Sequence, residues 1–336
     1  MKHFTRNVLI GGGIGCGCLV GGSYFFYANY NNKKNTQNAV PKLSGEEYNK
    51  LQDASLLKEA LHPSHAPWKK SDKPRDNDFD MRFYRLLGCP YCAKVESVLK
   101  YYKLPYEERI INPLNGAGLP DPRYDLAPQI ELHSPPEKEP VKSVFLVDSS
   151  YIIEKLAQPL GYQKDIEQSK DTTTVISSTR QWITSHFHSA SFVLTNSTLR
   201  NAYYSYDIVT PTQYQGSLFY KLVGCAALFS IANLKLKGKV QNDGNELMKE
   251  YFHAHQKEAY PSDALQWLTE ELNVFTNQIK KKNKDGAIFH GGATPDIADI
   301  EMFGVTRVID RHPVLGKAAR QGDFGAWQEA MQKFYD

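Results

Sequence analysis

Two cysteines separated by two residues, Cys89 and Cys92, are the strongest candidates for chemistry in this sequence. They follow an apolar run at residues 81–87 that is typical of a strand, and a helix is predicted from residue 93 to residue 102. This order places Cys89 at the helix N-cap, where free backbone N–H groups and the helix dipole stabilise a thiolate. Pro90 would take the first helical position, where its missing N–H costs nothing. Such a thiolate can act as a nucleophile near neutral pH or exchange with another thiol.

Strand and helix patterns alternate around this motif. Apolar runs predict strands, and a 3–4 spacing of apolar residues predicts helices. The strands expected are residues 82–87, 106–111, 129–132 and 144–147, and the helices are residues 90–102 and 149–160. Two strands parallel through a helix, followed by a hairpin and a closing helix, make an α/β thioredoxin-like domain, which we expect over residues 81–161.

The second half of the chain predicts helices only. From residue 166 onward we expect them at 173–199, 217–236, 246–256, 261–282, 296–310 and 324–334, so residues 162–336 form an all-α domain. Thirteen mostly apolar residues at 222–234 are short for a membrane span and predict a buried core helix rather than a second membrane contact. Asp296 and Asp299 have the spacing of a helix N-cap and its partner acid. Residues 280–282, three lysines, predict a solvated helix C-terminus.

Residues 8–27 carry no charge and approach the length of a helix that spans a bilayer. We expect a retained hydrophobic anchor helix over residues 1–30, a single-pass anchor in a mitochondrial membrane or an endomembrane (Golgi or endoplasmic reticulum). A flexible glycine-rich leader, a cleaved signal peptide and a mitochondrial presequence are the alternatives. Residues 31–80 predict a linker with one short helix, which a capping box of Ser44 and Glu47 begins and Pro63 ends.

Composition excludes several classes of function. The 336 residues have room for about two domains, and 41% apolar residues suffice to fill their cores. Five basic residues precede the first acid, Glu46, whereas the other 35 basic residues nearly balance the 37 acidic ones, so nothing supports nucleic-acid binding. Five scattered cysteines do not make a secreted disulfide framework, and a lone CxxC near such strands is typical of a redox motif.

A zinc site is the main rival interpretation of the cysteine pair. No second CxxC exists, and His186 and His188 are two residues apart, so they would not share a helix face. We therefore expect no metal site. These histidines are expected on the helix surface or in its packing, with haem or substrate contact as the lesser alternative.

Two further positions extend the motif into a groove. Ala127 and Pro128 precede the third strand, where a cis peptide bond is cheap only because the second residue is proline. Asp148 and Ser149 open the last helix of the domain, where backbone N–H groups can bind a carboxylate and Asp148 can bind an ammonium. An amino-acid headgroup at one end and a thiol near Cys89 at the other is the layout of glutathione.

An ordered set of motifs carries a wider resemblance. It comprises Cys89-Pro90-Tyr91-Cys92-Ala93-Lys94-Val95, Leu104-Pro105-Tyr106, Ile111-Asn112-Pro113, Asp148-Ser149-Ser150-Tyr151-Ile152-Ile153 and Phe289-His290-Gly291-Gly292 with Pro295-Asp296-Ile297-Ala298-Asp299. From about residue 81 to the C-terminus, this set resembles the membrane-associated prostaglandin E synthase type 2 family. The resemblance implies a glutaredoxin-type thioredoxin domain followed by an all-α glutathione-transferase C-terminal-like domain.

The resemblance also implies a glutathione site. Tyr91 would line its thiol end. Ala127 would offer backbone hydrogen bonds to the cysteine of glutathione, with Pro128 in cis. Asp148 and Ser149 would take the γ-glutamyl end.

The resemblance implies that Cys89 is the essential thiol and Cys92 its less critical partner. The sequence departs from the family at Leu86, where the family has a tyrosine and glutaredoxins usually have a lysine. The tyrosine's hydrogen bond to the thiol is therefore absent, and Arg85 would point to the opposite face of the strand.

The family is associated with converting prostaglandin H2 to E2 and with binding glutathione and haem together. The resemblance thus predicts an intramolecular oxidoreductase acting on a lipid endoperoxide. The Cys89 thiolate would interact with the O–O bond, and proton loss from the adjacent carbon would give the hydroxy-ketone. A glutathione-dependent thiol oxidoreductase or transferase, and a non-catalytic glutathione- or haem-binding membrane protein, are the alternatives. The partners expected are this small-molecule substrate and the membrane, with a homodimer left open.

Overall fold

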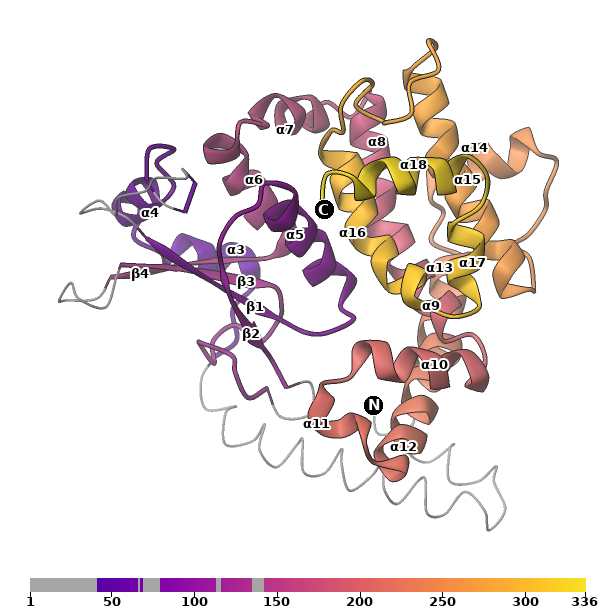
Figure 1. Ribbon diagram of the computed structural model, residues 1–336, viewed down its shortest axis with the longest axis horizontal. Coiled ribbons are helices and arrows are strands. Elements are labelled where there is room, and N and C mark those ends of the chain that lie inside the picture. The colour runs from indigo at the N-terminus through magenta and orange to yellow at the C-terminus, as the bar shows by residue number, and fades with distance from the viewer. Residues whose placement is uncertain (1–40, 66, 69–78, 113–115, 135–141) are drawn as a thin grey trace.

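The computed structural model describes residues 41–65, 67–68, 79–112, 116–134 and 142–336 (Figure 1). The membrane anchor expected at residues 1–30, and residues 31–40, 66 and 69–78 of the expected linker, lie outside these ranges.

Four strands form one sheet in the order β2-β1-β3-β4. They are β1 (Asp80–Arg85), β2 (Glu107–Ile110), β3 (Gln129–His133) and β4 (Ser143–Val147). β1 and β2 are parallel and are joined through α5 (Pro90–Tyr101), whereas β3 runs antiparallel to both β1 and β4. The chain closes this domain with α6 (Ser149–Leu160). The thioredoxin-like arrangement is as expected, except that β1 begins and ends two residues earlier, because the chain turns after Arg85 towards Gly88, whose φ is 68°.

Two helices before the sheet belong to the folded domain. They are α3 (Gly45–Lys50), begun by the capping box of Ser44, and α4 (Ala54–Ala60). Asn49 exchanges two hydrogen bonds with the Val147 backbone, at 2.9 and 3.1 Å, and Gln52 accepts the Phe145 N–H at 2.9 Å. These side chains occupy the free edge of β4, which would otherwise offer unpaired groups to another chain. The segment expected as a linker with one helix is therefore, over residues 44–61, two helices that complete the sheet.

Residues 162–336 are helical, as expected. The elements are α7 (Gln163–Lys170), α8 (Val175–Trp182), the π-helical turn η1 (Ile183–Phe187), α9 (His188–Thr195), α10 (Leu199–Val209), α11 (Thr212–Gln215), α12 (Leu218–Ser230), the π-helical turn η2 (Ile231–Leu236), α13 (Lys237–Gln241), α14 (Glu246–Ala254), α15 (Ala264–Lys282), α16 (Ile297–Arg311), α17 (Leu315–Ala319) and α18 (Gly322–Gln332). The sequence patterns missed α7, α10, α11 and α17. The side chain of Thr198 caps α10 by accepting the Asn201 N–H.

The prediction of a buried core helix at residues 222–234 is wrong. The helix from Leu218 to Gln241 is 24 residues long and apolar enough to cross a membrane, yet only 17% of its most apolar window is buried. It packs on α10 through a small apolar cluster of Ala202, Tyr206 and Cys225 that is separate from the main core. Apolar composition predicted burial, but nothing in the described structure covers the outer face of this helix.

The two domains meet where α16 packs on α5 (Figure 1). Gly304 permits this contact, because a Cβ there would lie 2.5 Å from the Ala93 carbonyl oxygen. The start of α16 is fixed by the expected capping box of Asp296 and Asp299, and the Trp327 indole donates to Asp299 at 2.8 Å. Lys282 is not simply solvated as expected, since it pairs with Asp296 at 2.8 Å.

Candidate functional site

The thiol loop holds Cys89 where the sequence places it, at the N-cap of α5 with Pro90 as the first helical residue. Gly88 turns the chain into this position in the left-handed region. A Cβ on Gly88 would also lie 2.2 Å from the Val209 side chain, so only glycine fits. Cys89 is half-buried and Cys92 is fully buried one turn further along the helix.

The two sulfurs differ in acidity. A hydrogen bond from the Cys92 thiol lowers the pKa of Cys89 below its ordinary value, and this effect exceeds the opposing effect of burial. The backbone N–H groups of Cys92 and Tyr91 and the charge of Arg85 lower it further. Burial, and then the Cys89 thiolate, raise the pKa of Cys92 well above its ordinary value. The pKa values of the two thiols are therefore shifted in opposite directions, and Cys89 is the more acidic of the two.

Arg85 also contributes to the lowered pKa of Cys89, although the sequence analysis expected it on the opposite face of the strand. Its side chain is held by Glu96 of α5 at 2.6 Å and by Glu108 of β2 at 3.0 Å. These carboxylates keep the guanidinium beside α5, where its charge acts on Cys89. Leu86, where the family has a tyrosine, supplies its backbone carbonyl to the Cys89 N–H at 3.4 Å.

Tyr91 is exposed and its ring lies edge-on to His188, with ring centroids 4.5 Å apart. His188 is buried, and neither ring nitrogen has a hydrogen-bond partner among the described residues. Burial, and then the charge of Lys94, lower the pKa of His188 well below its ordinary value, so the ring is neutral. The neutral ring of His188 packs against the Tyr91 ring. No pattern in the sequence indicated this contact.

Behind the motif lies a buried charged cluster that joins the domains. Lys94 donates to Thr184 at 3.2 Å and lies 3.8 Å from Glu301 of α16. Arg180 of α8 holds Glu301 with two hydrogen bonds, at 2.8 and 3.0 Å. Lys94 appeared in the sequence only as part of a motif, and its partners stand about 90 and 200 residues away.

The expected glutathione end is assembled in part. The Ala127–Pro128 peptide is cis, as expected. Asp148 caps α6 by accepting the Ser150 and Tyr151 N–H groups with Oδ1, at 2.8 and 3.2 Å. Those two amides are thus not free for a ligand carboxylate, which corrects the expectation for this helix start. The amide of Ser149 and Oδ2 of Asp148, which has no partner among the described residues, remain for an amino-acid headgroup.

The expected histidine pair divides between two environments. His186 lies in η1, and Asp243 and Glu271 hold its two ring nitrogens at 2.5 and 2.9 Å. Because both His186 and His188 are buried, neither offers an open imidazole at the thiol, so haem remains a prediction of the resemblance alone. Within the described ranges, no group of three His, Cys, Asp or Glu side chains could share a metal ion.

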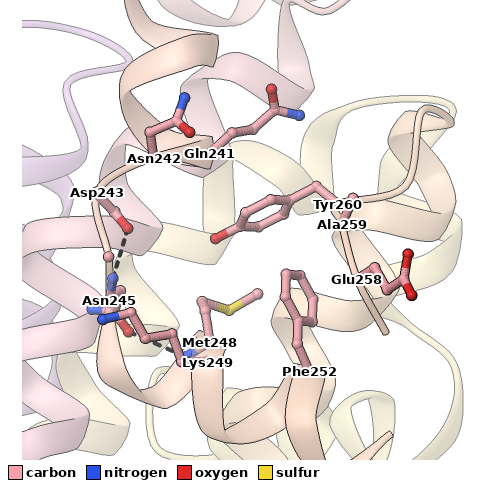
Figure 2. A pocket seen from close by; sticks show the side chains of 11 residues that line it. Gln241, Asn242, Asp243, Asn245, Met248, Lys249, Phe252, Glu258, Ala259 and Tyr260 are labelled. Atoms are coloured by element: carbon pink, nitrogen blue, oxygen red, sulfur yellow. Dashed lines mark hydrogen bonds between the residues drawn. The ribbon is translucent and has the colours of Figure 1, made fainter. Parts of the chain in front are cut away.

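A cavity of about 430 Å³ lies in the helical domain, away from Cys89 (Figure 2). Asp243 and Tyr260 line it, with Met248 and Phe252 on its floor. A second cavity of about 250 Å³ lies behind the thiol loop, between the domains, and includes Gly88 and Ala93.

The fold and the thiol loop together define a glutathione-transferase-like protein. Residues 83–159 match the family model "Glutathione S-transferase, N-terminal domain". More specifically, the chain is similar to prostaglandin E synthase 2 of Danio rerio, with 23% identity over 314 residues, which cover 80% of this chain and 75% of that protein. Prostaglandin E synthase 2 of Mus musculus is also 23% identical, over 77% of this chain and 71% of its own. The resemblance to this family is therefore confirmed.

The similarity to solved structures is more distant. A glutathione S-transferase from Pseudomonas fluorescens is 17% identical and aligns with 75% of this chain and 94% of its own, with a TM-score of 0.38.

Proposed function

We propose that this protein is a glutathione-dependent enzyme whose reactive group is the Cys89 thiolate. The observation that carries the proposal is the placement of Cys89 at the N-cap of α5 with the Cys92 thiol donating to it. Asp148 Oδ2 would hold the ammonium of glutathione and the Ser149 amide its carboxylate, with the Ala127 backbone and cis Pro128 beside its cysteine. Tyr91 would cover the thiol end. Bound glutathione would supply a second thiol next to Cys89.

The finer proposal is isomerisation of prostaglandin H2 to E2, which the similarity to two prostaglandin E synthase 2 proteins supports. The Cys89 thiolate attacks one endoperoxide oxygen, the S–O bond forms, the O–O bond breaks, and the second oxygen takes a proton to become the hydroxyl. A base then removes the hydrogen from the carbon bearing the first oxygen. The C–H electrons form the ketone as the S–O bond breaks and the thiolate returns. No net oxidant or reductant is consumed.

The test is to incubate the full chain with glutathione and prostaglandin H2 and to measure E2. The Cys89→Ser variant should lose at least about 100-fold in rate, because its hydroxyl is not ionised at neutral pH. Cys92→Ser is the matched control and should retain most of the activity. Full E2 formation by Cys89→Ser would overturn the mechanism.

A second function, thiol–disulfide exchange, is favoured by the contact between the two cysteines. The Cys89 thiolate would attack a substrate disulfide and release one thiol, and Cys92 would then displace the second, leaving a Cys89–Cys92 disulfide that two thiols of glutathione reduce. Reduction of bis(2-hydroxyethyl) disulfide separates the two proposals. Under this one, Cys92→Ser abolishes the dithiol cycle, whereas it spares the isomerase.

A further inference from the structure

The helix from Leu218 to Gln241 presents one continuous apolar face to solvent. Its exposed members, here called the apolar stripe, lie towards both ends of the helix: Leu218 (67% exposed), Phe219 (52%) and Leu222 (48%) at the start, and Ile231 (42%) and Leu234 (68%) further along. Small or half-buried residues fill the turns between them. On neighbouring α10, Leu199 and Tyr203 are also exposed, one turn apart. Monomeric proteins seldom expose so long an apolar surface without a partner.

The charges on the helix that carries the apolar stripe all have one sign. Residues 208–242 contain four lysines and no acidic residue. Lys221 is already paired with Asp207 of α10 and lies over the Tyr203 ring. The other three, Lys235, Lys237 and Lys239, follow the end of the stripe. An apolar face bordered by lysines is the pattern of a helix that lies in the headgroup region of an anionic bilayer.

The opposite face of the same helix is held by the protein. Val223, Cys225 and Ala232 are buried against the body, and Gly224 lies against the Tyr206 ring. The helix is therefore held along its length as one wall of the domain, with α10 and α11 beside it at one end of the molecule (Figure 1). This arrangement suits a helix lying flat on a surface rather than one crossing it.

We propose that the apolar stripe rests on an anionic lipid bilayer, with Lys235, Lys237 and Lys239 at the lipid headgroups. Charge favours lipid over a second copy of this chain, because pairing two stripes would bring lysines together with no acid on residues 208–242 to neutralise them. The anchor expected at residues 1–30 would keep this surface near a membrane.

Tryptophan fluorescence in vesicles tests the contact. Full-length Phe219→Trp and Leu234→Trp carry a reporter in the stripe, and Leu51→Trp carries one at a similarly exposed site (58%) at the C-cap of α3. Each is reconstituted into phosphatidylcholine–phosphatidylglycerol vesicles with brominated acyl chains. The added emission of both stripe variants should fall by about half, whereas that of Leu51→Trp should be unchanged, because bromine quenches only indoles within the bilayer. The four native tryptophans, buried Trp182, Trp267 and Trp327 and half-buried Trp68, are common to every variant and supply a constant background.

The charge contribution is tested in the same vesicles. Changing Lys235, Lys237 and Lys239 to Gln in the Phe219→Trp chain should reduce the quenching and its dependence on salt. Equal quenching of the reporters at 219, 234 and 51, or none at 219 and 234, overturns the proposal. So does protection of the stripe reporters from acrylamide without bromine quenching, since a second copy or residues 8–27 would then cover the stripe.

Discussion

Cys92 donates its thiol hydrogen to the sulfur of Cys89, so the two cysteines of the motif have opposite roles. Burial raises the pKa of the donor, whereas the pKa of the acceptor is lowered because it receives that hydrogen together with two backbone N–H groups at a helix start. The difference in acidity between the two thiols comes from Cys92, the helix start and Arg85, and it does not require a polar side chain at position 86.

Replacing Cys92 by Ala should raise the pKa of Cys89, since the hydrogen bond that lowers it most is lost. The pH dependence of iodoacetamide alkylation at Cys89, followed by mass spectrometry of its peptide, measures this pKa directly. Cys225→Ala, a buried thiol on α12, is the matched control and should leave the midpoint in place. An unchanged midpoint in Cys92→Ala would show that the helix start alone sets the acidity.

Gly304→Ala should lower the free energy of unfolding by about 2 kcal/mol. The new Cβ would meet the Ala93 carbonyl oxygen and the Ser97 side chain, and backbone must move to admit it. Gly238→Ala on α13 is the control, because nothing lies within 4 Å of its Cβ, and helix propensity makes this change neutral or stabilising. Urea unfolding of both variants checks the prediction, and equal stabilities would contradict the close approach of α16 to α5.

Glu301→Gln should cost about 3–5 kcal/mol of unfolding free energy, because it leaves Arg180 and Lys94 buried without a carboxylate. Lys94→Met should cost less than about 1 kcal/mol, because Arg180 still neutralises Glu301 and the methionine fills the space. Thermal and urea unfolding of the pair measure the difference. If Lys94→Met proved the more damaging, Lys94 rather than Arg180 would be the main counter-ion of Glu301.

His186 makes stability depend on alkaline pH. Burial alone would lower its pKa, but the charges of Glu271 and Asp243 reverse this and raise the pKa to about 9. The histidine is charged in both folded and unfolded chains below pH about 6.5, so its stabilisation is fully present there and is lost as pH rises through about 9. The shift corresponds to about 3 kcal/mol. His186→Gln should abolish this loss in urea unfolding from pH 6 to 10, whereas His253→Gln, on the surface of α14, should keep it.

Sequence reasoning succeeded where the determinants are local. The strands, Pro128 in cis and the caps at Ser44, Asp148 and Asp296 follow from patterns within a few residues. It failed where two distant segments meet. The apolar composition of residues 222–234 could not reveal that no other described segment packs against the outer face of this helix.

Distance in sequence also hid two structural partnerships. The sequence pattern predicted Asn49 and Gln52 as ordinary helix residues. Their side chains instead form hydrogen bonds with the backbone of β4, almost a hundred residues away. Lys94 was noted only as part of a motif, although it pairs with the carboxylate of Glu301 on α16. Neither partner is marked by a pattern in one chain, because each relation exists only once the tertiary fold brings the segments together.

The pairing of Asn49 with Val147 also sets an order of events during synthesis. The segment that finishes the sheet leaves the ribosome 98 residues before the strand that it pairs with. It must therefore remain unpaired until β4 emerges, so closure of the sheet is a late step governed by a long-range contact.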